Sequence, residues 1–303
     1  MRIKFVLLLV LTSQLCSAQN TSLITIPGTK CSMIPPDGFV TAANFGGFQN
    51  AAIGASIMIN ELPVKYETLI SSFTKEALLS KGMVLVSKQP SDFSQGKAML
   101  INITQAANGI SYIKQMLIFG KNNTTIIVNG IYPEGSKEIE PAMKKALLST
   151  VYDANQSDDP LGAAIFTIDT KDTDFTFTKF VSGSLLYSVE GKIPTEKPVF
   201  IISPSFTAIP LANQKKYAED RIKAFPGGEN NVIKQMNDIS IDNMKGYEII
   251  ADGKTKKGAH ELIYQVIIYD QQGNYFLIVG QSAEEMDNNL TVFKKMARTF
   301  KRK

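Results

Sequence analysis

The sequence feature that most constrains the fold is an internal repeat, in which residues 246–300 return to a pattern met 150 positions earlier. With this ungapped offset, Gly130 corresponds to Gly280 and Gln115 corresponds to Gln265. The identities are few, but the order of strand, turn, strand and helix is the same in both copies. A fixed period of this kind indicates a duplicated supersecondary unit. The chain is therefore expected to contain two related domains in tandem.

Each copy predicts three strands followed by a helix. Residues 262–269 (LIYQVIIY) and 275–280 (YFLIVG) are rich in β-branched and aromatic side chains, which suit a pleated and packed surface. The polar loop between them contains Gly273, which is typical of a hairpin. Ser282 and Glu285 have the spacing of a capping box, which predicts that a helix begins here. The apolar stripe of that helix consists of Leu290, Phe293, Ala297 and Phe300.

The segment before each copy predicts a further strand and a further helix. Residues 55–60 (ASIMIN) form a strand, and residues 62–82 form one helix with an apolar face that ends at Gly82. In the second half, residues 199–203 (VFIIS) correspond to the strand and residues 211–225 to the helix. The predicted fold class is α+β, with two tandem antiparallel β-sheet domains that each pack two helices on the sheet.

The first residues of the chain have the pattern of a secretory signal peptide, residues 1–18. Arg2 and Lys4 precede an apolar core, and small residues precede a cleavage site after Ala18. A lipoprotein signal processed at Cys16 is the alternative, although the bulky Leu15 fits that processing badly. The apolar run is too short to span a bilayer. We therefore expect an exported protein, periplasmic or secreted, without a transmembrane segment after cleavage.

Composition and a polar run set the expected domain limits. Residues 153–163 begin with DANQSDDP, which is typical of a linker, so a first domain over 19–152 and a second over 164–303 are predicted. The chain is 44% hydrophobic and 20% charged, as in folded proteins. Its formal charge of +4 falls to about +2 without Arg2 and Lys4. This near balance gives no reason to expect nucleic-acid binding.

The opening of the first half carries a resemblance to a known group. Residues 34–39 (IPPDGF), the later apolar helix and the paired lysines of the last helix resemble the PsbP-like domain group. That group includes exported bacterial proteins of the DcrB type and a eukaryotic Ran-binding branch. The second half lacks the glycine and the aromatic residue of this opening near Ile193 and Pro194. The resemblance implies a tandem PsbP-like exported bacterial protein, and it brings no catalytic residue with it.

The residues that could carry chemistry are few and scattered. His260 is the only histidine and precedes a strand, without a nucleophile motif to support it, so a loop or strand-edge histidine is predicted. Cys31 has no partner for a disulfide within the chain once the leader is removed. A small buried residue is expected there, with a reactive thiol or a linkage point to another chain as the alternatives. Asp169, Asp172 and Asp174 lack the glycine and glutamate of a calcium loop and predict a solvated turn. No catalytic residue, metal site or cofactor is predicted.

Three functions follow from these observations. The first is a non-catalytic exported protein that binds a partner protein of the cell envelope or assists envelope assembly. The second is a small-molecule or lipid carrier in the periplasm, with a cavity between sheet and helix lined by Phe73, Met116 and Phe119. The third and least favoured is an enzyme, because the adjacent Asp158 and Asp159 lack an enclosed setting for acid–base chemistry.

Overall fold

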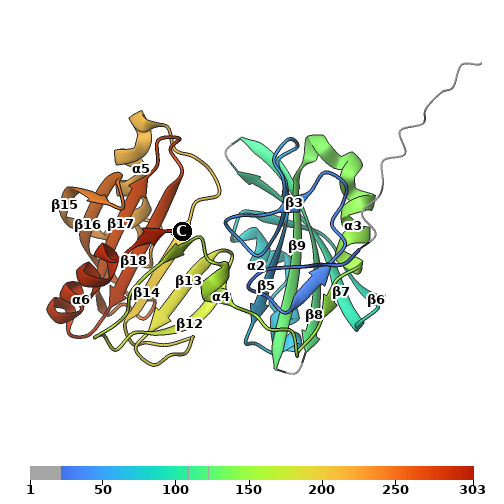
Figure 1. Cartoon of the computed structure of the whole chain (residues 1–303), viewed down its shortest axis with the longest axis horizontal. Coiled ribbons are helices and arrows are strands. Elements are labelled where there is room, and N and C mark those ends of the chain that lie inside the picture. Colours follow the sequence, from blue (N-terminus) through green and yellow to red (C-terminus); the bar gives the residue numbers. More distant parts are fainter. Residues whose placement is uncertain (1–21, 108, 122) are drawn as a thin grey trace, which may run out of the picture.

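The computed structural model describes residues 22–107, 109–121 and 123–303, and its main elements are two antiparallel sheets of seven strands (Figure 1). Figure 1 shows the two halves of the chain side by side, the first in blue to green and the second in yellow to red. The predicted α+β class is confirmed by these two sheets and their helices. The predicted leader and its cleavage after Ala18 lie outside the described residues.

The two large sheets have the same strand order. In spatial order, the first sheet consists of β3 (Val40–Thr41), β4 (Gly47–Asn50), β5 (Ala55–Leu62), β9 (Thr124–Pro133), β8 (Ile110–Lys121), β7 (Gly96–Ala107) and β6 (Met83–Phe93). The second consists of β12 (Thr176–Val181), β13 (Ser184–Ser188), β14 (Val199–Pro204), β18 (Tyr275–Ser282), β17 (His260–Tyr269), β16 (Met244–Lys254) and β15 (Val232–Ile241). Matched along the chain, each strand of one sheet therefore has a counterpart in the other.

Each half also contains one small sheet, which joins the beginning of that half to its end. The strand β10 (Val151–Tyr152) and the strand β1 (Ile24–Thr25) both pair with β2 (Cys31–Met33). In the second half, β11 (Phe166–Thr167) pairs with β19 (Lys301–Arg302). In each half, a strand near the start thus pairs with a strand at the end, so each half closes on itself.

Helices cover both faces of each large sheet. The helices are α1 (Tyr66–Ser71), α2 (Lys75–Leu79), α3 (Glu140–Leu148), α4 (Pro160–Ala163), α5 (Gln214–Ile222) and α6 (Met286–Arg298), with the 3₁₀ turns η1 (Glu134–Ile139), η2 (Leu211–Asn213) and η3 (Gly228–Asn230). One hydrophobic cluster packs α3 on the first sheet, and a second packs α1 and α2 on its other face. In the second half, α6 and α5 take these two places.

The single helix predicted over residues 62–82 is wrong, because the structure breaks it into α1 and α2. The Ser71 and Ser72 hydroxyls donate back to carbonyls of α1, at 2.9 and 2.7 Å. Such local bonds compete with continued helix. Thr74 then begins α2, because its Oγ1 accepts the amide of Ala77 at 3.1 Å.

A glycine lets the last helix of each half approach its sheet closely. A Cβ added at Gly280 would lie 2.4 Å from Cγ of Phe293 on α6, and one added at Gly130 would lie 2.4 Å from Sδ of Met143 on α3. Carbon atoms in contact are normally about 3.5–4.0 Å apart. The glycine pair and the side chains above it therefore keep the offset of 150 residues.

The predicted correspondence between Gln115 and Gln265 at the same offset of 150 residues is wrong. Gln115 pairs with Gly130, whereas Gly280 pairs with Tyr264, so Tyr264 takes the place of Gln115. Gln265 lies on the opposite face, where its Nε2 donates to a carbonyl of α5 at 2.8 Å. The hairpin loop between β17 and β18 is longer than the one between β8 and β9. A shift of one residue moves a side chain to the other face of a sheet.

The outermost strands share a β-bulge despite these shifts. The register changes between Leu85 and Ser87 in β6 and between Ile233 and Gln235 in β15. Pairing across the first sheet leads from Gly130 to Ser87, and pairing across the second sheet leads from Gly280 to Gln235. Both bulges therefore lie directly before equivalent residues. A bulge bends an exposed edge strand and disfavours pairing with another chain. The two sheets thus share their strand order and also the position of this bulge.

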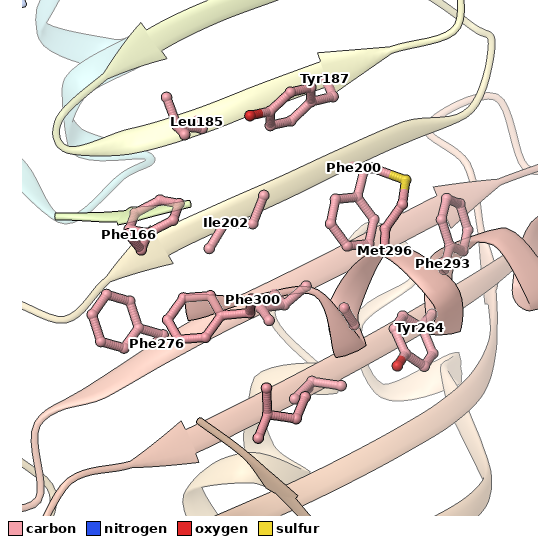
Figure 2. Close-up of a cluster of buried hydrophobic side chains, with 14 of the residues drawn as sticks. Phe166, Leu185, Tyr187, Phe200, Ile202, Tyr264, Phe276, Phe293, Met296 and Phe300 are labelled. Atoms are coloured by element: carbon pink, nitrogen blue, oxygen red, sulfur yellow. The ribbon is translucent and has the colours of Figure 1, made fainter. Parts of the chain in front are cut away.

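The core beneath α6 is aromatic (Figure 2). The Phe293 ring is fully buried, and its centroid lies 5.8 Å from the rings of Phe175 and Phe200 and 6.2 Å from that of Tyr264. Figure 2 shows Phe200, Phe293 and Met296 gathered over the sheet, with Phe300 further along the same face. Aromatic side chains bury large areas and fix their neighbours through ring geometry. This face of the second sheet is therefore filled by closely packed rings.

The predicted capping box at Ser282 and Glu285 is wrong. Glu285 adopts a left-handed conformation with φ of 42°, and its side chain does not cap the helix. The Asn289 amide instead donates to Ser282 Oγ at 3.2 Å and to the Glu284 carbonyl at 2.9 Å. Because Asn289 is itself buried, it holds the turn before α6 from within the helix.

Candidate functional site

His260 lies at the start of β17 with its side chain 60% exposed. Its Nε2 is 3.5 Å from Oδ1 of Asp252, and Oδ2 of the same carboxylate lies 2.8 Å from Nζ of Lys234. The bond from Lys234 is the main reason that the pKa of Asp252 lies below its ordinary value. The prediction of a strand-edge histidine is confirmed.

Cys31 is fully buried in the cluster beneath α3, which confirms the predicted small buried residue. Burial raises the pKa of its thiol far above the ordinary value, and the nearby carboxyl of Glu61 adds to this. A thiol that stays protonated is a poor nucleophile.

The predicted solvated turn at the three aspartates is also confirmed. Oδ1 of Asp169 accepts the amide of Lys171 at 2.8 Å, and Asp172 is exposed with φ of 56°. Nζ of Lys295 lies 4.0 Å from Oδ2 of Asp172. Within the described residues, no group of three or more His, Cys, Asp or Glu side chains could hold a metal ion.

The residues predicted to line a carrier cavity lie on opposite sides of the first sheet, with Met116 and Phe119 on β8 and Phe73 between α1 and α2. Met116 belongs to the cluster beneath α1 and α2, where Phe73 packs against it. Phe119 belongs to the cluster beneath α3, because side chains three residues apart on a strand point to opposite faces. A carrier cavity between sheet and helix stays a prediction.

A surface groove that the sequence did not indicate lies beside η2 in the second half. A hollow of about 730 Å³ is bordered by Leu211, Met244, Lys245 and Tyr269, and it adjoins a second hollow of about 560 Å³. Both hollows are lined by Leu211, Gln214 and Lys245. We call the two together the Leu211 groove. The volume of each hollow is in the range of sites that take ligands or side chains, about 300–1,000 Å³.

The wall of the Leu211 groove is held by the backbone. The amide of Ile209 donates to the Gly273 carbonyl at 2.8 Å, which fastens the segment before η2 to the hairpin between β17 and β18. Gly273 has φ of 85°, and a Cβ there would lie 2.4 Å from the Ile209 carbonyl oxygen. Only glycine fits this close approach. The groove is therefore pre-formed rather than built from loose chain.

The floor of the groove is tied to α5 by a tyrosine. The Tyr269 hydroxyl donates to the Gln214 carbonyl at 3.1 Å. Burial raises the pKa of Tyr269, so the hydroxyl keeps its proton at neutral pH and remains a donor. A second pair behind it joins the hydroxyls of Tyr217 and Tyr275 at 2.6 Å.

Leu211 and Lys245 are exposed groups that border both hollows of this groove, and the exposed Asp238 borders the second hollow. The Leu211 side chain is 83% exposed, the highest value among the large hydrophobic residues that the structure describes as exposed. Lys245 has no carboxylate within 4 Å among the described residues, whereas Arg302 is paired with Asp242 at 2.7 Å. An apolar side chain thus stands beside an unpaired positive charge.

The two halves of the chain meet through a small set of specific contacts. The turn between β12 and β13 points at the first half, where Ser182 donates from its amide and hydroxyl to Oδ1 of Asn60, at 3.0 and 3.1 Å. The next residue, Gly183, has φ of 77°, and a Cβ there would lie 1.8 Å from the Asn44 carbonyl oxygen. The ring of Phe45 meets that of Phe206 edge to face at 5.8 Å.

A cavity of about 210 Å³ lies between the halves, next to these contacts. We call it the interdomain cavity. One wall is apolar, with Ile59 from β5 and the rings of Phe177 and Phe180 from β12. The charged groups are Glu61 from the first half, Lys179 from the second, and Asp158 from the segment that joins them.

The electrostatics of the interdomain cavity depend on burial. Burial raises the pKa of the Glu61 carboxyl, and the charge of Asp158 raises it further, although the amide of Lys30 donates to Oε1 at 2.8 Å. Burial lowers the pKa of Lys179, against the attraction of Glu61. The hydroxyls of Thr29 and Thr178 both donate to backbone carbonyls, so neither is an activated nucleophile.

The comparisons with known proteins concern structure alone. No protein-family model matches the chain, and no curated protein matches its sequence. Among solved structures, the chain is similar to LpqN of Mycobacterium tuberculosis, described as involved in cell envelope biogenesis, with 13% identity over 45% of this chain and 82% of LpqN and a TM-score of 0.35. It is also similar to the cyanobacterial PsbP of Synechocystis sp. PCC 6803, with 11% identity over 41% of this chain and 87% of that one and a TM-score of 0.31.

A third similar structure extends over both halves of the chain. It is the T6SS immunity protein TplEi of Pseudomonas aeruginosa, solved with an "L" peptide, with 10% identity over 93% of this chain and 99% of that one and a TM-score of 0.29. The PsbP structure belongs to the group that residues 34–39 were predicted to resemble. In the described part of the chain, no helix has both the length and the apolar character needed to cross a membrane.

Proposed function

We propose that this chain is a non-catalytic exported protein that binds a partner protein through the Leu211 groove. The observation that carries the proposal is the leucine itself, which is 83% exposed at the edge of a hollow of about 730 Å³. Water contact with an aliphatic side chain costs free energy, and burial of a leucine recovers about 1.5–3 kcal/mol. An apolar residue beside a pre-formed groove is typical of an interaction site.

The partner is an extended protein segment that carries an apolar side chain next to an acidic one. The apolar side chain packs between Leu211 and Met244, and the carboxylate pairs with Lys245. This assignment follows charge complementarity, because Arg302 is neutralised by Asp242 while Lys245 is not. Two other carboxylates border the groove, Asp270 and Asp238, and neither forms an ion pair with Lys245 among the described residues.

The domain limits 19–152 and 164–303, joined by residues 153–163, belong to the same proposal. Support comes from β10, which ends the first half on β2, and from β11, which begins the second half on β19. Export through a leader cleaved after Ala18 and a role in envelope assembly are part of it as well. The alternative is the periplasmic small-molecule or lipid carrier, with Phe73, Met116 and Phe119 as its cavity residues.

The experiment that tests this function is site-specific photocrosslinking in envelope extract of the native host. A photoreactive amino acid with an aliphatic side chain replaces Leu211 in the protein that begins at Gln19, and a matched variant carries it at Leu79, which is 68% exposed in the first half. We expect one partner to crosslink at position 211 and not at 79. Excess unlabelled wild-type protein should compete, and a Leu211→Ser variant should compete only at a concentration about tenfold or more higher. Equal crosslinking at both positions would contradict the proposal.

A further inference from the structure

The interdomain cavity combines charges of both signs with an apolar wall. Glu61 and Asp158 lie on the side of the first half and the joining segment, and Lys179 lies on the side of the second half. Between them are Ile59, Phe177 and Phe180. The volume of about 210 Å³ is below the range of about 300–1,000 Å³ for drug-sized ligands, so the cavity suits a small molecule.

Lys179 is the first group that lacks a partner. Its side chain is half-buried and forms no hydrogen bond or ion pair within 4 Å among the described residues, although Glu61 is near enough to attract it. A β-bulge between Phe177 and Lys179 places it there, which is a common way to redirect a side chain. A partly buried ammonium without a carboxylate in direct contact is costly. A bound carboxylate would remove that cost.

Glu61 is the second charged group of the cavity with an unpaired polar atom. Its Oε1 accepts the backbone amide of Lys30 at 2.8 Å, and its Oε2 has no donor among the described residues. Asp158 is exposed at the mouth of the cavity and adds negative charge beside Glu61. A bound ammonium group would take the free oxygen of Glu61 and offset the repulsion between the two carboxylates.

We infer that the interdomain cavity binds a small zwitterion of the α-amino acid class with an apolar side chain. Its ammonium group binds Glu61 and Asp158, its carboxylate binds Lys179, and its side chain packs on Phe177, Phe180 and Ile59. Because the ligand bridges the two halves, its binding couples them. This inference goes beyond partner binding at the Leu211 groove and does not depend on it.

The test is isothermal calorimetry of the protein beginning at Gln19 with L-leucine, L-leucine methyl ester and N-acetyl-L-leucine, with L-phenylalanine as a second side chain. The ester lacks the carboxylate and the acetyl form lacks the ammonium charge. We expect each blocked form to bind about tenfold or more weakly than leucine, because each loses one hydrogen-bonded charge pair. Absence of binding by both free amino acids would overturn the inference, as would equal binding of the ester.

Two variants assign the charged groups. In Lys179→Met, leucine and its methyl ester should bind with equal affinity, because the group that reads the carboxylate is gone. In Glu61→Gln, the new amide oxygen can still accept from Lys30, and leucine and its acetyl form should become equal. The controls are Lys192→Met and Glu190→Gln, an exposed pair 3.6 Å apart in the second half. If the variants and the blocked ligands act additively, these side chains do not contact the ligand.

Discussion

Replacement of the two corresponding glycines by alanine should have unequal effects, because different side chains cover them. A Cβ at Gly280 would lie 2.4, 2.5 and 2.7 Å from three ring atoms of Phe293. That ring is fully buried against Phe175 and Phe200 and cannot turn away. Helix α6 must therefore move outward from the sheet by about 1 Å to restore normal contact.

The magnitude follows from two opposing terms. Overpacking of a dense core costs about 1–3 kcal/mol, while the loss of glycine freedom in the unfolded chain returns about 0.4–1 kcal/mol. The free energy of unfolding should fall by about 1–2 kcal/mol for Gly280→Ala. At Gly130 the same atom meets Sδ and Cγ of Met143, a flexible side chain that can adapt. Gly130→Ala should therefore cost less than about 1 kcal/mol.

The assay is urea denaturation of wild type and both variants, followed by circular dichroism. Gly135→Ala is the control, because nothing lies within 4 Å of a Cβ there and its φ is not positive; it should be neutral or slightly stabilising. A cost for Gly130→Ala equal to or above that for Gly280→Ala would refute the reasoning. So would an unchanged midpoint for Gly280→Ala, because α6 would then not depend on the glycine.

Two further predictions concern titratable groups. The bond from Arg302 holds the pKa of Asp242 below its ordinary value, so the stability that this pair contributes is present above about pH 3.9 and is lost as the pH falls through the lower folded pKa. Asp242→Asn should be less stable than wild type at neutral pH, and the two urea midpoints should converge in acid; a constant difference across the range would contradict this. The buried thiol of Cys31, whose pKa burial raises, should react with iodoacetamide far more slowly in the native protein than in urea, as followed by mass spectrometry. Equal rates would show that the thiol is exposed.

Strand pattern predicted most of the fold, because side chains that alternate or pack on both faces leave a clear signal. The counterpart of residues 55–60 at residues 199–203 is confirmed by β5 and β14, whose residues Ile57 and Phe200 pair with Gly130 and Gly280. The wrong predictions arose where a single residue or a change in loop length decides the local structure. A longer hairpin loop moved Gln265 to the other face, and Thr74 began a new helix where the apolar periodicity continued.

The candidate sites could not be predicted because the groups come from distant parts of the chain. Glu61 and Lys179 line the same cavity only because the two halves pack together, and neither residue belongs to a recognisable sequence motif. Leu211 has the spacing of the first apolar residue of the helix predicted over 211–225. In the structure α5 begins at Gln214, and η2 before it leaves Leu211 in solvent. Pattern alone does not separate these two outcomes.

The central claim is that Leu211 contacts the partner protein, and affinity measurement tests it most directly. Once crosslinking has identified the partner, its dissociation constant is measured by calorimetry for wild type, Leu211→Ser and the matched Leu79→Ser. Burial of a leucine stabilises a complex by about 1.5–3 kcal/mol, so Leu211→Ser should weaken binding roughly tenfold to a hundredfold. Leu79→Ser should leave the affinity unchanged. Equal affinities of wild type and Leu211→Ser would contradict the claim.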